Sequence, residues 1–172
     1  VPHESTGIGG RGTLEVKTND ISGRIKEGEV GFTVEFGRPG VGVYFRDVDG
    51  VCQRLAQMPL EFQKQNPLTA LMTDLKSGKL RTDVLQEKVL SCILEFKAQA
   101  ADLPEILKVI ESEVRRLDTV VALGVAVRCD SQGNDPVQKQ LQTLGYDAWR
   151  GKINMGLGKR TNPLPLEGEK AQ

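Results

Sequence analysis

The chain has 172 residues with 23 basic and 23 acidic side chains, and it is 38% hydrophobic and 27% charged. This length is typical of one domain with a buried core, and the balanced charge excludes a global field that would attract a polyanionic partner. No stretch approaches the roughly 18 consecutive apolar residues of a membrane span. The cysteines Cys52, Cys92 and Cys129 are spaced too widely for a zinc pair or a disulfide framework. We therefore expect a soluble, cytoplasmic protein.

The distribution of glycine divides the chain. Of its 19 glycines, only Gly78 falls between residues 51 and 123. Glycine weakens a helix interior by roughly 1 kcal/mol relative to alanine, so its scarcity predicts a helical middle. The expected division is a flexible arm over 1–12, a single α+β domain over 13–150 and a flexible tail over 151–172. Within the domain we expect 13–50 to be β-rich, 51–123 helical and 124–150 mixed.

Three segments of the first fifty residues alternate apolar with polar or small side chains, as half-buried strands do. They cover residues 13–17, 30–36 and 41–45. Arg38, Pro39 and Gly40 form a turn signal between the second and third segments. The pattern therefore predicts a hairpin from Phe32 to Phe45.

Three helices are expected in the first part of the middle region. Residues 51–65 keep a helical spacing that Pro59 interrupts, so this helix should be short or kinked. Asn66 and Pro67 are typical of a helix start, and the helix they begin should end near Gly78. The third helix should run over 82–100. Its apolar face would contain Leu85, Val89, Cys92 and Phe96.

The strongest periodic signal follows over residues 102–123. Asp102 can cap this helix, and Glu105 occupies the position that completes a capping box. Apolar residues then repeat at spacings of four and three, which we call the apolar seam. Its members are Leu103, Leu107, Ile110, Val114, Leu117 and Val121.

Two further elements are expected near the C-terminal end of the domain. Residues 125–129 alternate as a strand does, although the preceding helix could also continue through them. Asp135 and Pro136 begin a last short helix, which Gly145 ends. Together the patterns predict an α+β fold, with a small N-terminal antiparallel sheet or hairpin, a mainly antiparallel helical bundle and flexible arms at both ends.

Two glycine-rich segments carry parts of phosphate-binding motifs without the context that these motifs need. Gly7, Gly9 and Gly12 spell G-x-G-x-x-G, but a strand is expected after them instead of a helix. The segment 156–161 lacks the first glycine of a P-loop, and Arg160 follows its lysine where serine or threonine is required. We reject both motifs.

Side chains that usually carry catalysis are few and scattered. His3 is the only histidine, and in a flexible arm it cannot be held against a nucleophile. The cysteines fit small buried hydrophobes. The neighbouring acidic pairs fit solvated surface charge; they are Glu27 and Glu29, Asp47 and Asp49, and Glu111 and Glu113. We predict no catalytic, metal-binding or cofactor-binding residue and no small-molecule ligand, and keep an enzyme with dispersed carboxylates as an alternative.

One segment combines cationic and aromatic side chains and lacks acidic ones. Such a segment can follow phosphates and stack bases, or its tryptophan can anchor it on the domain or on a neighbouring subunit. We favour docking and keep a nucleic-acid-binding accessory protein as an alternative function. The candidate residues are Trp149, Arg150, Lys152, Lys159 and Arg160.

The apolar seam suggests the leading function. Part of it should pack inside its own chain, but long helices with this repeat are also common self-association elements. We therefore expect a non-catalytic structural or assembly subunit, such as a viral or scaffold-type subunit, that forms a homo-oligomer through its helical region.

Overall fold

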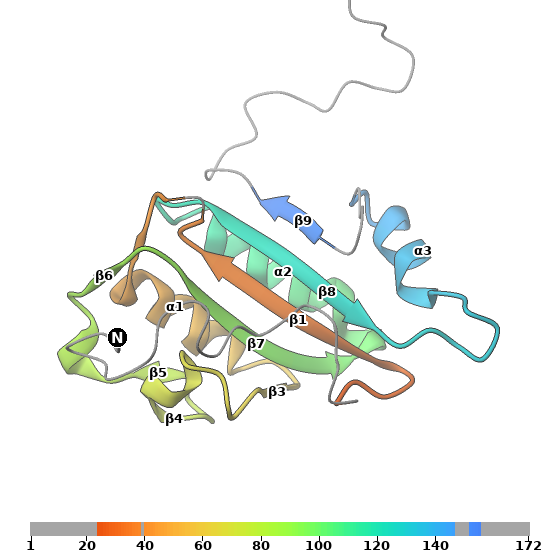
Figure 1. Cartoon of the computed structure of the whole chain (residues 1–172), viewed down its shortest axis with the longest axis horizontal. Coiled ribbons are helices and arrows are strands. Elements are labelled where there is room, and N and C mark those ends of the chain that lie inside the picture. The colour runs from red at the N-terminus through yellow and green to blue at the C-terminus, as the bar shows by residue number, and fades with distance from the viewer. Residues whose placement is uncertain (1–23, 39, 147–151, 156–172) are drawn as a thin grey trace, which may run out of the picture.

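The computed structural model describes residues 24–38, 40–146 and 152–155, which form an α+β domain of two layers (Figure 1). The helices are α1 (Phe45–Leu55), α2 (Leu103–Val114) and α3 (Pro136–Thr143). The main sheet contains β1 (Glu29–Phe36), β3 (Leu60–Phe62), β7 (Cys92–Gln99), β8 (Val121–Val127) and β9 (Lys152–Met155). Two small sheets pair β2 (Val43–Tyr44) with β6 (Lys88–Val89) and β4 (Met72–Asp74) with β5 (Lys79–Leu80).

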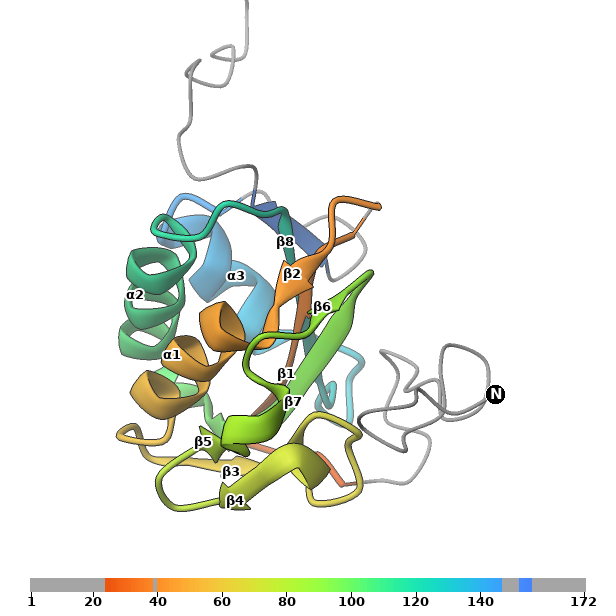
Figure 2. The same ribbon diagram turned by 90° about the vertical axis from the view of Figure 1, so that its left-hand side faces the viewer.

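The strand order of the main sheet interleaves two β-α-β units. The order is β3-β7-β1-β8-β9, and every neighbouring pair is antiparallel. The first unit is β1, α1 and β3, the second is β7, α2 and β8, and β1 lies between the two strands of the second unit. This is the split β-α-β, or ferredoxin-like, arrangement. Figure 2 shows α1 and α2 together on one side of the sheet, and no described helix covers the other side.

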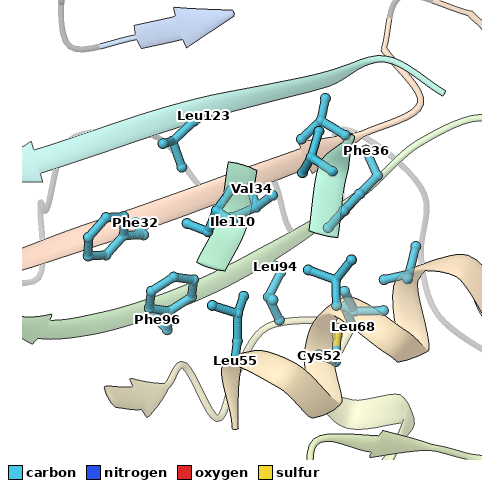
Figure 3. Close-up of a cluster of buried hydrophobic side chains, with 14 of the residues drawn as sticks. Phe32, Val34, Phe36, Cys52, Leu55, Leu68, Leu94, Phe96, Ile110 and Leu123 are labelled. Atoms are coloured by element: carbon cyan, nitrogen blue, oxygen red, sulfur yellow. The ribbon is translucent and has the colours of Figure 1, made fainter. Parts of the chain in front are cut away.

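The core lies between the main sheet and the helices. On β1, Val30, Phe32, Val34 and Phe36 are each at most 2% exposed. Figure 3 shows three of these side chains beside Ile110 of α2. Their register partners on the same face are Ala98, Phe96, Leu94 and Cys92 of β7 and Val127, Val125, Leu123 and Val121 of β8. Each large apolar side chain buried in this way contributes roughly 1.5–3 kcal/mol.

The expected helical bundle is wrong, because the middle of the chain supplies a strand next to the centre of the sheet. Residues 92–99 form β7 instead of the end of a helix. From Leu94 to Ala98 apolar and charged side chains alternate, and the apolar ones enter the core. Hydrogen bonding to β1 on one side and β3 on the other outweighs the helical spacing of the apolar residues.

The structure also corrects the expectation of a small N-terminal sheet. The neighbours of β1 come from β7 and β8, which follow it by more than fifty residues. Among the described residues, the hairpin expected from Phe32 to Phe45 does not form, since β2 pairs with β6 and Phe45 begins α1. The segment 13–17 lies outside the described residues.

The Asn66 and Asp135 side chains form the expected local caps, whereas Asp102 precedes α2 without a capping hydrogen bond from its side chain. The Asn66 side-chain oxygen accepts a hydrogen bond from the Leu68 backbone N–H at 2.8 Å, but only a short 3-10 turn over Thr69–Leu71 follows. At α3, the Asp135 carboxylate accepts from the backbone N–H of Val137 at 2.9 Å, as expected of a cap.

Other helix boundaries differ from expectation. Helix α1 ends at Leu55, before the proline at position 59, and α2 ends at Val114 instead of running to residue 123. The alternation over 125–129 is partly explained by β8, so this region is a strand and not a continued helix. Among the described residues, no helix combines the length and apolar character needed to cross a bilayer.

We predict that Ile110→Ala lowers the free energy of unfolding by about 2–5 kcal/mol, because truncation leaves a cavity in a packed core. Ile110 is 0% exposed on α2. Chemical denaturation measures the change. Lys108→Ala on the exposed side of the same helix is the control and should stay within about 0.5 kcal/mol. Equal effects of the two substitutions would contradict the packing described.

Candidate binding pocket

The sheet face without helices carries small and polar side chains. On β1 these are Gly31, Thr33 and Glu35, which alternate with the core residues. On β7, Glu95 lies directly opposite Thr33, and Lys97 lies opposite Gly31. Glu35 and Glu95 are only 7% and 4% exposed. Two buried carboxyl groups on this face require explanation, because burial penalises charge.

A hollow of about 310 Å³ opens over β1, β3 and β7, and we call it the open-face pocket. One wall is Ile25, which lies so close to the sheet that a Cβ atom on Gly31 would come within 2.7 Å of its Cδ1 atom. Glycine at position 31 therefore permits the approach of this wall. The charged residues that line the pocket are Arg24, Lys26, Glu61, Glu95 and Lys97.

Two buried polar atoms of residues that line the pocket, and one of a residue beside Glu95, have no hydrogen-bond partner in the part of the chain that the structure describes. They are Thr33 Oγ1, Asn66 Nδ2 and Glu95 Oε2. Thr33 and Glu95 are register partners, and the contact between the Asn66 amide and the Glu95 carboxylate lowers the pKa of Glu95 although it lacks regular hydrogen-bond geometry. Folded proteins satisfy roughly 90% or more of such groups, and each exception costs about 1–3 kcal/mol. Thr33 and Glu95 line the same pocket, which indicates a site shaped for an external polar group.

Glu95 is the strongest chemical feature of the pocket. Burial raises its pKa, because the carboxylate loses hydration, while the Asn66 amide and the positive charge of Arg24 lower the pKa in part. No salt bridge reaches Glu95 from the described residues. A buried acid with a displaced pKa at a pocket is a frequent sign of a functional site.

The neighbouring charges on this face are paired. Lys97 Nζ lies 3.0 Å from Glu29 Oε1 and 3.8 Å from Glu61 Oε2. The Glu35 carboxylate lies 2.7 Å from the Arg38 guanidinium. These pairs balance charge at the rim of the face, whereas the carboxylate inside the pocket has no such contact.

A second hollow of about 400 Å³ lies between α1 and α2. Its cationic side chains are exposed, and each contacts a partner close in sequence. The contacts join Arg54 to Gln57, Lys108 to Glu105 and Arg116 to Glu113. Exposed pairs of this kind contribute little, so we assign no site to this hollow.

The structure places the apolar seam inside the protein. Leu103, Leu107, Ile110 and Val114 lie on α2 and are at most 2% exposed. The other two members leave the helix: Leu117 is half-buried in the following turn, and Val121 begins β8 as a fully buried residue. These side chains pack within one core, so they offer little apolar surface for a second subunit.

The basic aromatic segment lies mostly outside the described residues, which include none of Trp149, Arg150, Lys159 and Arg160. Lys152 belongs to β9, the edge strand of the main sheet, where it is the register partner of Gly124. The region 152–155, expected to lie in a tail, is therefore a strand at the edge of the domain.

Sequence reasoning missed Thr33, Asn66 and Glu95 as candidates for a site. The helix expected over 82–100 contains Glu95, and its position on that helix indicates nothing unusual. The period-two alternation of Leu94, Glu95, Phe96 and Lys97 was the available signal. This alternation places Glu95 on the face of the strand opposite the apolar residues. The burial of its side chain, however, depends on segments distant in sequence.

Among the described residues, no group of three or more histidine, cysteine, aspartate or glutamate side chains is arranged to hold a metal ion. Comparison of the chain with protein-family models, curated proteins and solved structures finds no significant match. The geometry of the open-face pocket is therefore the basis for a functional proposal.

We predict that Glu95→Gln raises the free energy of unfolding by about 1–3 kcal/mol at a pH above the folded-state pKa of Glu95, because it removes a buried charge without a partner. Between the unfolded value of 4.5 and the higher folded value, the folded protein binds more protons than the unfolded chain. The contribution of the Glu95 carboxyl group to the stability of the wild-type protein therefore falls as pH rises through that window. At pH values below that window, the difference in the free energy of unfolding between Glu95→Gln and wild type should shrink.

Denaturation of both proteins across pH measures this difference, and Glu61→Gln is the matched control. The Glu61 side chain is 68% exposed and lies on the same face, so its replacement should change stability by no more than about 1 kcal/mol. A Glu95→Gln protein less stable than wild type at a pH above the folded-state pKa would show that the Glu95 carboxylate is a stabilising structural group.

Proposed function

We propose that this protein is a non-catalytic binding subunit that engages a protein partner through the open-face pocket. The observation that carries the proposal is that two unpartnered buried polar atoms, Thr33 Oγ1 and Glu95 Oε2, belong to residues that line one hollow of the sheet. Natural proteins retain such costly features mainly where function requires them. A partner that supplies the missing hydrogen bonds recovers part of that cost on binding.

The location of the proposed contact replaces the one expected from sequence. The apolar seam is occupied by the protein's own core, which argues against a subunit contact along α2. The sheet face without helices supports a contact better, because an antiparallel sheet can bury one face and leave the other for recognition. Its pocket lies on β1, β3 and β7, and rigid strands hold recognition groups more accurately than loops do.

Binding is favoured over catalysis by the surroundings of Glu95. Acid-base catalysis needs a second group positioned across the substrate. The other ionisable lining residues on the strands, Lys97 and Glu61, contact each other at 3.8 Å. The Lys97 ammonium also contacts Glu29 at 3.0 Å, so these groups are engaged as ion pairs and not poised for proton transfer.

The proposal predicts that a defined array of immobilised random heptapeptides contains sequences that the full chain binds, and that filling the pocket abolishes this selection. Thr33→Tyr places a large side chain in the pocket. Thr82→Tyr makes the same replacement at an exposed threonine away from the sheet and should bind like wild type. Gln63→Tyr, at another lining position, is a second blocking variant should Thr33→Tyr fail to fold.

Thermal unfolding of each variant establishes that it is folded before the array is probed. The proposal is wrong if wild type selects no peptide above background, or if both folded blocking variants select the same peptides as wild type.

A further inference from the structure

We infer that the open-face pocket accepts a cationic side chain, lysine or arginine, from the partner. This inference rests on the proposed binding function and specifies its chemistry. The acceptors for the cation are Glu95 Oε2 and Thr33 Oγ1, which lie on adjacent strands and have no partner among the described residues. Glu95 is 4% exposed and is one of the residues that line the pocket.

The charge of Glu95 is the principal reason for a cationic ligand. A buried carboxylate without an ion pair is unfavourable, and a matching cation relieves this penalty more effectively than a neutral group. The charge of Arg24 lowers the pKa of Glu95 only in part, and the Lys97 ammonium is held by Glu29 at 3.0 Å and 3.1 Å to the two carboxylate oxygens. Charge-assisted hydrogen bonds are also about twice as strong as neutral ones.

The hydrogen-bonding inventory agrees with an ammonium or guanidinium group. These groups carry three and five N–H donors respectively and no acceptor, which suits a carboxylate and a hydroxyl oxygen in one pocket. The Asn66 Nδ2 atom is a hydrogen-bond donor, so it cannot accept a hydrogen bond from a cationic ligand. Asn66 is 1% exposed and lowers the pKa of Glu95, so its amide supports the ionised form that the cation requires.

The pocket volume and its rim limit the ligand further. About 310 Å³ is near the lower end of ligand pockets, roughly 300–1,000 Å³, and fits one extended side chain. The charged groups facing the pocket are Arg24 and Lys26 from the preceding segment, Glu61 from β3, and Lys97 beside Glu95 on β7. These rim groups are three cations and one anion, so selectivity for a cation should arise at Glu95 itself, against the charge of the rim.

The test uses the isotope-labelled full chain and two capped tripeptides, acetyl-Gly-Arg-Gly-amide and its citrulline analogue, which has nearly the same shape without the charge. NMR titration follows the backbone amides of Thr33 and Glu95 and the side-chain carboxyl carbon of Glu95. The arginine peptide should bind at least about tenfold more tightly than the citrulline peptide. Its affinity should increase as pH rises through the pKa of Glu95, and its binding should lower that pKa.

Glu95→Gln should remove the preference for arginine and its pH dependence, whereas Glu61→Gln should keep both. Because the pKa of Glu95 is followed in the unaltered protein, the inference stays testable if Glu95→Gln does not fold. Equal binding of the two peptides would overturn the inference of a cationic ligand while leaving the pocket as a binding site. Binding of neither peptide would overturn it too, and the peptide array then decides the proposed function separately.

Discussion

Burial of β1 between β7 and β8 is the constraint on which the rest of the structure depends. Val30, Phe32, Val34 and Phe36 must all enter one core, and they do so together only in one register with both neighbours. A strand alternates faces at every residue, so a shift by one position would expose the entire apolar set. The intervening residues of β1 are thereby directed to the opposite face.

The same constraint builds the open-face pocket. Once Phe32 and Phe96 face the core as register partners, Thr33 and Glu95 become neighbours on the other side of the sheet. The Phe32 and Phe96 rings stack with centroids 4.7 Å apart, which holds the two strands together beneath the pocket. The unfavourable burial of Glu95 is therefore tolerated because the packing on the opposite side of the same strands is strong.

The placement of an acid in such an environment changes its chemical properties. Water would screen a carboxylate on an open sheet, and its interactions would then be weak. Burial to 4% exposure raises the pKa of Glu95 and strengthens any electrostatic contact that it makes. The ion pairs of Lys97 and Arg38 nearby keep the remaining carboxylates of the face neutralised, so that Glu95 differs from them chemically.

The sequence by itself determined the features that depend on neighbours along the chain. It predicted the strand over 30–36, the buried face of α2 from Leu103 to Val114, and the cap at Asp135. Only the tertiary structure decided that residues 92–99 form a strand and that Glu95 is buried beside Thr33. Apolar residues in that segment satisfy both a helical and a strand spacing, and hydrogen bonding to strands distant in sequence selects between them. The burial of a charge likewise depends on which distant segments surround it, so no local pattern contained the site.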